Sequence, residues 1–516
     1  MVRAGQLAYF AKDTKAYKPL RAAHTFTAKK ERVALLWGDS VYVIGIEGDF
    51  ATVSAKGHHL RLPLADLMET PLLSVYQIDA GQGDSALVHF PDGRWMMVDG
   101  GPAHDLSNTG RIAADFLYWK MFVDQSWRKE FGFGGRRFTV DALVCTHPDY
   151  DHYGGFIDMT DKLRTGVLEY RAVFHSGLGR FTGAAQAYRN GMGFGQLGPV
   201  RGRVLPDAYV TTLIDGFDDV RRYAGERGSR RWTLSGNYGQ WLLDLAQLEG
   251  GAVGGLQRVH RGIVHLPGFA PAPGTASVAV LGPVEERWRR RPALRYLDTG
   301  GAGAMASPSL TRNGHSVVLR VDYDRVRILL TGDLNFRSQA LLLHHVPAVE
   351  FSCHVAKACH HGSEDVSWTF IQAMSPLATL VSSGDNESYS HPRARMLGLT
   401  GAFGRLQTRR GKARFLGLEE ERYEAPLIYS TELSRSIELF ECAAVFDDGD
   451  NRIPKATLEA VPRSRRADGR RAGYKDWLLG DRMVYGLINV RTDGRRILLA
   501  VLKESEASFQ IEELRA

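Results

Sequence analysis

The stretch Thr146-His147-Pro148-Asp149-Tyr150-Asp151-His152-Tyr153-Gly154-Gly155 directly follows the apolar segment 142–145. Four of its side chains, His147, Asp149, Asp151 and His152, are of types that bind metal ions, and they fall within six residues. An apolar segment followed by Thr-His and closed by Gly-Gly is typical of a loop at a strand end, which projects its side chains into one cavity. The sequence therefore predicts a metal-binding loop here.

This stretch resembles the His-x-His-x-Asp-His signature of the metallo-β-lactamase fold, with Asp149 in place of the second histidine. The same substitution occurs in the C-terminal domain of the ComEC-type DNA-uptake proteins, and further landmarks similar to that family follow in order. They are a glycine loop at 79–85, a strand ending in a buried aspartate at 97–101, an Asn-to-Ser strand entry at 313–319, a bridging-aspartate motif at 329–334, a Lys-x-x-His-His-Gly-Ser motif at 357–363 and an Asn-x-x-Tyr-x-His-Pro ending at 386–392. The resemblance covers roughly residues 73 to 445 and does not include the transmembrane channel of the uptake proteins.

The resemblance implies an α+β fold, the αββα sandwich of the metallo-β-lactamases, which we expect at residues 72–445. Repeated apolar strands with helices between them agree with two sheets covered by helices. A Gly-rich and irregular stretch at about 177–311 contains several arginine clusters. We expect this stretch to be an insertion in the domain.

Two smaller units are expected outside this domain. Residues 1–71 contain short alternating segments separated by Gly-Asp and Lys-Gly turns, which predict a small β barrel that loosely resembles a Src-homology-3 barrel. Residues 446–516 contain a basic linker and then a C-terminal β-hairpin appendage with Asp493-Gly494 at its turn. The basic linker either contacts nucleic acid or is a solvated face, and the sequence leaves both interpretations open.

The resemblance also implies a set of metal ligands. Asp333 is expected to bridge two divalent ions, Asp151 and His152 to bind one ion, and His147 and Asp149 the other. Three carboxylates beside two divalent cations leave a charge of about +1, which suits a hydroxide and an anionic phosphate. Because a carboxylate at position 149 makes the pocket richer in oxygen, manganese or magnesium competes with zinc better than at an all-histidine site. We therefore expect two ions, Zn²⁺ or Mn²⁺, with Mg²⁺ as a further option.

Other residues receive distinct roles. One of His360 and His361 is expected to bind metal and the other to contact substrate; we take His360 as the ligand, although sequence does not separate adjacent imidazoles. His175 is either a mid-domain ligand or a loop histidine, and His391 is either an acid or phosphate donor or a structural residue. The residues expected to take part in catalysis are Asp151, His361, His391 and Lys357, and those expected to orient the ligands are Asp84, Asp99, Asn313 and Ser363.

Composition sets broad limits. The 516 residues carry a net charge of +7, which mildly favours polyanionic partners. Four scattered cysteines are too few for a disulfide framework or a cysteine-based zinc site. The first 15 residues lack the apolar core of a signal peptide, and no stretch reaches the roughly 18 apolar residues of a membrane span. We therefore expect a cytoplasmic protein without a membrane segment.

These observations predict a metal-dependent hydrolase, most simply a nuclease or phosphodiesterase whose substrate and partner is DNA. Two alternatives stay open. One is a hydrolase of a small-molecule ester, such as a phosphocholine ester, a cyclic nucleotide or a lactone, because this fold hosts many reactions. The other is a non-catalytic binding or regulatory module.

Overall fold

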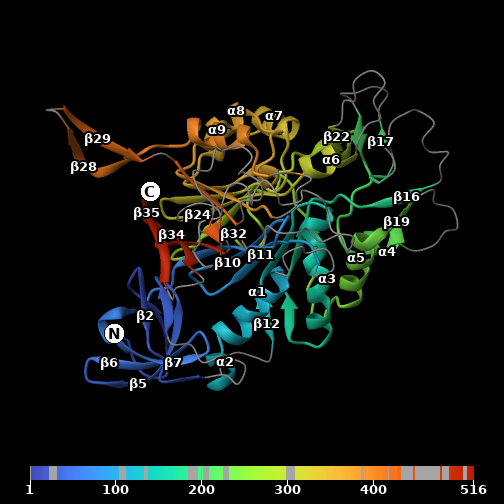
Figure 1. The fold of residues 1–516 in the computed structure, drawn as a ribbon. Helices are drawn as coiled ribbons and strands as arrows, with labels where there is room; N and C mark the ends of the chain where they lie inside the picture. Colours follow the sequence, from blue (N-terminus) through green and yellow to red (C-terminus); the bar gives the residue numbers. More distant parts are fainter. Residues whose placement is uncertain are drawn as a thin grey trace.

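The computed structural model describes residues 2–22, 32–103, 112–132, 137–183, 196–198, 200–201, 208–224, 232–297, 308–384, 389, 391–415, 418–424, 426–431, 446–447, 477–478, 487–503 and 508–516. Two β-sheets face each other, helices cover their outer faces, and a smaller N-terminal β unit adjoins them (Figure 1). The two sheets position the candidate site between them.

The first sheet has nine strands, in the order β20-β15-β13-β11-β10-β9-β33-β34-β35. Their bounds are β20 (Leu256–Arg258), β15 (Val173–His175), β13 (Ala142–Cys145), β11 (Trp95–Gly100), β10 (Ser85–His89), β9 (Leu73–Gln77), β33 (Ile488–Thr492), β34 (Arg496–Lys503) and β35 (Ser508–Arg515). Strands β11, β13, β15 and β20 pair in parallel, so their carboxyl ends lie at one edge of the sheet. Side chains at the ends of β11 and β13 therefore meet there.

The second sheet has the order β21 (Ser277–Gly282), β24 (Val318–Tyr323), β25 (Val326–Leu330), β26 (Val355–Lys357), β27 (Ala378–Val381) and β30 (Leu427–Ser430). Strands β25, β26, β27 and β30 pair in parallel. Alternate side chains of both sheets fill the space between them, with Val88, Val98 and Val144 of the first sheet packing in one core with Leu319 and Ile328 of the second. Burial of this apolar surface holds the two sheets together.

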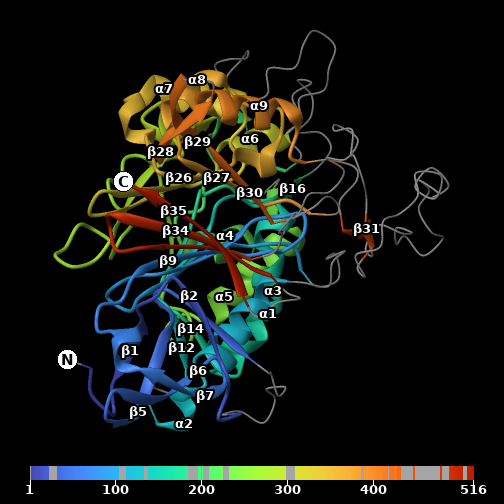
Figure 2. The ribbon, with the colours of Figure 1, turned by 60° about the vertical axis from the view of Figure 1, so that its left-hand side comes forward.

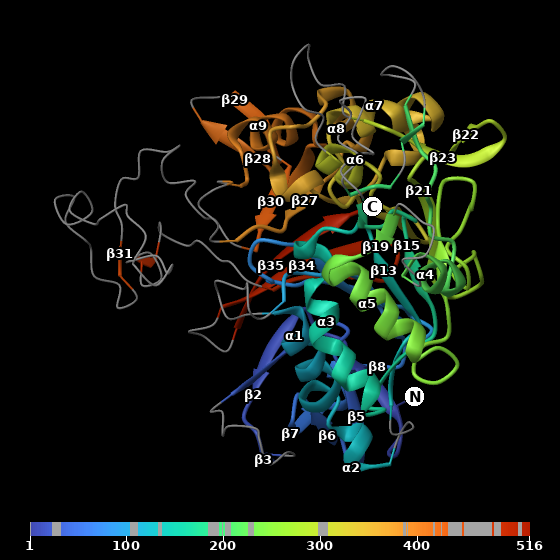
Figure 3. The ribbon, with the colours of Figure 1, turned by 90° about the vertical axis from the view of Figure 1, so that its right-hand side faces the viewer.

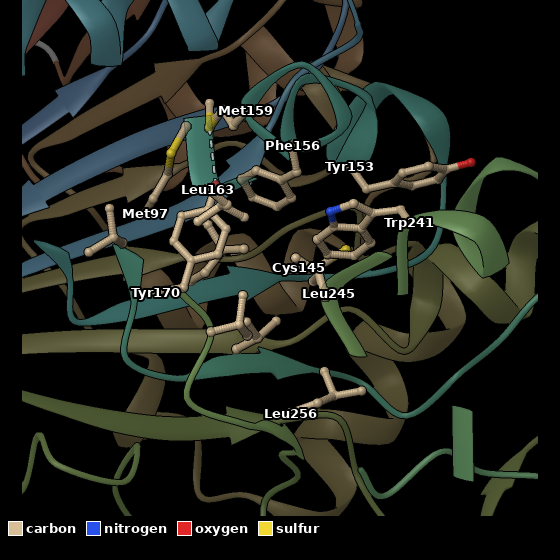
Figure 4. Close-up of a cluster of buried hydrophobic side chains, with 14 of the residues drawn as sticks. Met97, Cys145, Tyr153, Phe156, Met159, Leu163, Tyr170, Trp241, Leu245 and Leu256 are labelled. Atoms are coloured by element: carbon tan, nitrogen blue, oxygen red, sulfur yellow. Dashed lines mark hydrogen bonds between the residues drawn. The ribbon is translucent and has the colours of Figure 1, made fainter. Parts of the chain in front are cut away.

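Helices α1 (Ala113–Trp119), α3 (Tyr150–Arg164) and α5 (Gly236–Gln247) cover the outer face of the first sheet. Helices α7 (Phe336–His345), α8 (Trp368–Met374) and α9 (Ala394–Phe403) cover that of the second. In Figure 4 the rings of Tyr153 and Phe156 from α3 lie against Trp241 of α5, with ring centroids 6.1 and 5.5 Å apart. The layers follow the expected αββα order, and α3 is anchored by its aromatic side chains.

The N-terminal unit has its own small core. Its six-stranded sheet has the order β3-β7-β6-β5-β1-β8, and β2 pairs with β4. The bounds are β1 (Leu7–Phe10), β2 (Thr14–Tyr17), β3 (Arg21–Ala22), β4 (Val33–Leu36), β5 (Ser40–Glu47), β6 (Phe50–Ala55), β7 (His58–Pro63) and β8 (Leu67–Met68). Buried Phe10, Leu35, Val43, Val53 and Leu60 pack together inside it. Its likeness to a Src-homology-3 barrel stays a prediction.

A buried set of charged side chains joins this unit to the first sheet; we call Asp39, Lys56, Lys120, Asp124 and Arg491 the junction cluster. Asp39 lies 2.6 Å from the Lys56 ammonium and 3.0 Å from the Arg491 guanidinium, and Lys120 lies 2.7 Å from Asp124. The Lys120 ammonium and the Arg491 guanidinium both make cation–π contacts with the ring of Tyr76, each 4.6 Å from its centroid. Every carboxylate in the junction cluster thus has a cationic partner.

Two expectations about organisation need correction. The hairpin β33–β34 is not a separate appendage, because β33 pairs with β9 and extends the first sheet (Figure 2). The stretch 177–311 is not simply an insertion, because β20 pairs with β15 of the first sheet and β21 pairs with β24 of the second. The basic segment 463–471 lies outside the described residues.

The remaining elements flank the two sheets. They are α2 (Trp127–Glu130), α4 (Phe217–Ala224), α6 (Pro308–Gly314), β12 (Phe138–Val140), β14 (Leu168–Tyr170), β16 (Phe181–Gly183), β17 (Val200–Arg201), β18 (Tyr209–Val210), β19 (Trp232–Leu234), β22 (Glu286–Trp288), β23 (Arg291–Arg295), β28 (Gln407–Phe415), β29 (Leu418–Glu424), β31 (Phe446–Asp447) and β32 (Trp477–Leu478). In the part of the chain that the structure describes, no helix is both long and apolar enough to cross a membrane.

Candidate metal centre

Two glycines fix how the predicted loop enters α3. A Cβ on Gly155 would lie 2.1 Å from the Gly100 carbonyl oxygen, and a Cβ on Gly154 would lie 2.5 Å from the Ala103 backbone nitrogen. Both distances are shorter than real Cβ contacts, so a side chain at either position would push α3 away from the end of β11. The Gly-Gly pair therefore allows His152, in the first turn of α3, to approach Asp99.

Asp99 fixes the orientation of this histidine. Its Oδ1 accepts a hydrogen bond of 2.7 Å from the Thr146 backbone N–H, and its Oδ2 accepts one of 2.7 Å from the Thr146 hydroxyl. The same Oδ2 lies 2.8 Å from His152 Nδ1. Nδ1 therefore donates to Asp99, and Nε2 of His152 points into the site. This is the orienting contact that we expected of Asp99.

Four buried side chains from four segments converge beside it. Asp84, His152, Asp333 and His361 each offer one ligand atom, and these atoms lie within 4.8 Å of one another. Asp333 Oδ2 is 3.2 Å from the Nε2 atoms of both His152 and His361, and Asp151 Oδ2 is 3.3 Å from His361 Nε2. We call Asp84, His152, Asp333 and His361 the metal centre. Asp333 therefore lies at its middle, as a shared ligand must.

The three imidazoles of this region fit a metal ion. His147 Nδ1 lies 3.2 Å from the Ser316 hydroxyl oxygen, and His361 Nδ1 lies 3.0 Å from the Ser382 carbonyl oxygen. The Nε2 atoms of His147, His152 and His361 are buried, and none makes a hydrogen bond with a described residue. A buried ring nitrogen without a hydrogen bond is costly unless a cation takes its lone pair. Imidazole and carboxylate ligands together suit zinc or manganese.

The charges around these rings differ from one histidine to the next. Burial disfavours protonation, yet the carboxylates nearby, Asp333 first, raise the pKa of His152 and of His361 well above the usual value. Burial and the neighbouring His152 lower the pKa of His147 to about 3. The pKa of Asp333 falls well below its usual range because the charges of His361 and His152 outweigh the effect of burial. The carboxylates that raise these pKa values also favour a divalent cation, which competes with protons for the ring nitrogens.

The adjacent histidines reverse one expectation. His360 and His361 both have positive φ angles, 47° and 54°, and their rings point in different directions with an interplanar angle of 64°. His361 is buried and belongs to the metal centre, whereas the side chain of His360 is 27% exposed with its Nε2 3.6 Å from Asp333 Oδ2. Geometry thus favours His361 over the expected His360 as the buried ligand, and leaves His360 facing the edge of the site.

Asp149 accepts hydrogen bonds from arginine side chains and is not one of the four residues of the metal centre. Its Oδ1 accepts a 2.6 Å hydrogen bond from Arg312 Nε and a second one from Arg180. The Asn313 amide nitrogen, oriented toward oxygen acceptors, donates to Asp149 Oδ2 over 2.8 Å, and His147 Nε2 lies 3.8 Å from that oxygen. Only one oxygen of Asp149 therefore faces the imidazole that was expected to share a metal with it.

Two expected catalytic residues take different positions. Lys357 is buried, forms an ion pair with Asp84 and donates to the Gly332 carbonyl oxygen over 2.9 Å. It therefore braces the carboxylates and does not reach toward a substrate. His391 is mostly buried, its ring stacks on that of His361 at 6.2 Å, and its Nδ1 lies 3.4 Å from the Gln82 amide nitrogen. If this amide donates to Nδ1, the hydrogen of His391 is on Nε2.

The remaining expected residues are also located. His175 lies outside the metal centre, where its Nδ1 is 3.2 Å from the Tyr238 hydroxyl, so the geometry does not support it as a ligand. Ser363 accepts a hydrogen bond from the Asp365 backbone N–H and orients the turn after His361 rather than a ligand. Asp84, expected only to orient ligands, is itself one of the four converging groups.

Part of this site lies in a region that matches a known protein family. The model of the Metallo-beta-lactamase superfamily matches residues 78–278. Residues 78–278 are therefore similar to that superfamily. The match contains the loop 146–155 and Asp84, while Asp333 and His361 lie beyond it, in the segments that follow β25 and β26.

Two individual proteins are also similar to parts of this chain. "ComE operon protein 3" of Bacillus subtilis (strain 168) is 31% identical over 90 residues, which is 17% of this chain and only 11% of that protein's length. The solved structure of the metallo-beta-lactamase fold protein YhfI from Bacillus subtilis aligns with 64% of this chain and 93% of its own, with 8% identity and a TM-score of 0.30. The expected superfamily and the partial likeness to a ComE protein are thus confirmed.

Some contributors to the site were not predicted. Ser316 connects three parts of it: its hydroxyl donates to the Asn313 carbonyl, accepts from the Asp333 backbone N–H and lies beside His147 Nδ1. Its place in the Asn-to-Ser landmark was the available signal. Arg180 and Arg312 had none, because their link to Asp149 depends on how distant segments pack.

Proposed function

We propose that this protein is a metal-dependent phosphodiesterase that cleaves DNA. The observation that carries the proposal is the convergence of Asp84, His152, Asp333 and His361 within 4.8 Å, together with buried imidazole nitrogens that have no hydrogen bond to a described residue. The DNA part of the proposal is supported by the ComEC-like set of motifs and by the net charge of +7. Fold alone does not select a substrate.

The residues divide the work between holding cations and handling protons. His152, Asp333, Asp84 and His361 would hold one divalent ion, and His147 with one oxygen of Asp149 would contribute to a second. A bound divalent ion lowers the pKa of water toward neutrality and offsets the charge of a phosphate. The protein's own side chains orient the attacking water and bind the phosphate.

Asp151 is the most open carboxylate at the centre, with a side chain that is 36% exposed and 3.3 Å from His361 Nε2. It can accept a hydrogen bond from the attacking water and orient it. His391 stays neutral near pH 7, because burial and then the neighbouring histidines lower its pKa to about 3. With Gln82 donating to Nδ1, its Nε2–H is available as a donor to a phosphoryl oxygen. A neutral imidazole in this position binds the phosphate and does not protonate the leaving group.

The test is a metal-loaded digestion assay. Purified protein with Mn²⁺, Zn²⁺ or Mg²⁺ is incubated with single-stranded DNA, duplex DNA and RNA, and with chromogenic phosphodiester, phosphocholine and lactone substrates. We expect cleavage of DNA that requires added metal and is removed by chelator. Faster turnover of a phosphate-free ester than of any phosphodiester would overturn the proposal, as would protein that retains metal but cleaves no member of the panel.

A further inference from the structure

The hairpin formed by β22 and β23 carries an exposed cluster of arginines at its tip. Register pairs Trp288 with Arg291, so Arg289 and Arg290 are the two residues of the turn. Arg287, Arg289, Arg290 and Arg291 are all exposed. Figure 3 shows this hairpin at the edge of the molecule. Four cationic side chains within five residues make the tip a concentrated positive patch.

The two residues of this turn have a backbone conformation that is unfavourable for arginine. Arg289 has a φ of 47° and Arg290 a φ of 69°. Two-residue hairpin turns with positive φ at both positions are usually filled by Asn-Gly, because a Cβ crowds the backbone in this region. The side chains of both residues are exposed and fill no core that would offset this cost. Strain of this kind at a surface turn is a reason to look for a function of the side chains.

The charges at the tip lack acidic partners among the described residues. Glu286, the acidic residue of the hairpin, is held by Arg295 near its base. The preceding Glu285 is held by Arg258. None of the four tip guanidiniums forms an ion pair with a described carboxylate. The patch therefore keeps its full charge for an external anion.

Side-chain contacts hold the strands on both sides of the tip. Trp288, which directly precedes the turn, stacks on Tyr209 of β18 with ring centroids 5.5 Å apart, and the Arg295 guanidinium of β23 lies 5.1 Å from the same tyrosine ring. Strands that are held in place before binding reduce the entropy lost when the tip binds a ligand. These contacts distinguish the patch from a solvated run of charges.

Strand β23 connects the tip to the wall of the metal centre. The Arg295 carbonyl oxygen lies 2.6 Å from His315 Nε2, and the next residue, Ser316, contacts His147. From Arg291 to Arg295 an extended strand spans about 14 Å at roughly 3.4 Å per residue. That span corresponds to about four phosphates of one B-form strand. The tip is therefore about four phosphates away from the contact between Arg295 and His315, and Ser316, the next residue, accepts a hydrogen bond from the Asp333 backbone N–H.

We propose that the β22–β23 tip holds the phosphate backbone of DNA beside the cleavage site. The inference rests on the proposed function for the identity of the ligand, but binding can be measured without cleavage. The contacts would be to phosphates, so they add affinity and salt dependence rather than sequence preference.

The test measures the affinity of a fluorescein-labelled 20-base-pair duplex in EDTA as a function of NaCl concentration. In the double variant Arg289→Asn/Arg290→Gly, we expect at least about tenfold weaker binding near 0.1 M salt, with the slope of log K against log salt smaller by about two. The midpoint of unfolding should not fall, because Asn-Gly suits this turn. Arg289→Lys/Arg290→Lys keeps the charge and should retain most of the affinity.

The matched control is Arg221→Gln/Arg222→Gln, which removes two exposed charges that are already paired on α4. Its affinity should stay within twofold of wild type. The inference is overturned if the tip variant binds DNA with unchanged slope, if the control weakens binding equally, or if the tip variant loses binding to phosphatidylserine vesicles but not to DNA. The binding assay in EDTA is independent of cleavage. If the metal-loaded protein cleaves no DNA but the tip still contributes to DNA binding in EDTA, only the proposed function is refuted.

Discussion

The molecule contains two buried clusters of charged side chains that differ in how many cationic groups face their carboxylates. In the junction cluster, Asp39 faces both Lys56 and Arg491, and Asp124 faces Lys120. In the metal centre, Asp84 and Asp333 share a single ammonium group, that of Lys357, and the ring nitrogens that face them make no hydrogen bond with a described residue. Burying charge is costly unless it is paired. The carboxylates of the first cluster are paired with cationic side chains, which favours stability, whereas those of the second leave room for an added cation, which favours chemistry.

The largest expected difference is in catalysis. Asp333→Asn removes the carboxylate nearest to both His152 and His361, which lie 3.2 Å from it. Metal binding of this kind supplies several kcal/mol to a transition state. With about 1.4 kcal/mol per tenfold, kcat/KM for a DNA substrate should fall about a thousandfold or more. Asp39→Asn makes the same chemical change in the junction cluster and should alter kcat/KM less than about twofold. Equal losses in the two variants would remove the distinction between the clusters.

The next difference is in folding stability. Asp39→Asn leaves the Lys56 and Arg491 charges without their carboxylate, and both Asp39 and Arg491 have side chains less than 5% exposed. Breaking a buried ion pair by removing one partner costs about 3 kcal/mol or more. Urea unfolding monitored by circular dichroism should show this loss, while added metal should still raise the unfolding midpoint. A stability change below about 0.5 kcal/mol would mean that the junction cluster does not brace the N-terminal unit.

A smaller effect, on metal affinity, is expected from Asp99, which contacts a ligand and is not one of the four residues of the metal centre. Asp99→Asn keeps the size of the side chain but weakens the contact of 2.8 Å that orients His152. Loss of such a supporting partner typically lowers metal affinity by about 10- to 100-fold. Competition with a chromogenic chelator measures the affinity directly. Asp124→Asn, in the junction cluster, is the control and should leave metal affinity unchanged.

The smallest expected effect concerns acid. Although burial raises the pKa of Asp39, Lys56, Arg491 and Lys120 together hold it below the ordinary value of 3.8. A carboxyl whose pKa is depressed on folding stabilises the protein above its unfolded pKa, and this contribution is lost as pH falls through the folded pKa. The gap in unfolding free energy between wild type and Asp39→Asn should therefore be constant from pH 7 to 5 and narrow below 3.8. Urea titrations at several pH values measure the gap, and a gap that widens in acid would contradict this assignment.

Sequence predicted the parts of the site that depend on local spacing. The loop 146–155 needed only a strand end, four ligand types and Gly-Gly, and all of these act within ten residues. The choice between His360 and His361 could not be made from the sequence, because it depends on two successive left-handed backbone conformations that ordinary residues seldom adopt. Position in a motif does not reveal which of two neighbouring rings turns inward.

Sequence could not predict pairings between distant segments. β33 pairs with β9 more than 400 residues earlier, so a hairpin that looks independent completes a sheet. The same limit applies to Arg491, whose partner Asp39 belongs to the N-terminal unit, and to Arg180, whose partner is Asp149. A lone arginine in a sequence carries no mark of the carboxylate that it will meet, because its guanidinium can donate to any Asp or Glu that packing brings within reach.

The most direct test of the metal centre is the metal content of the purified protein. Wild type and Asp333→Asn are loaded with Zn²⁺ or Mn²⁺, dialysed against metal-free buffer and analysed by inductively coupled plasma mass spectrometry, with Asp39→Asn alongside. The account predicts about one to two ions per chain in wild type and in Asp39→Asn, and a large loss in Asp333→Asn. Wild-type protein that retains no metal, or an Asp333→Asn variant that retains as much as wild type, would contradict it.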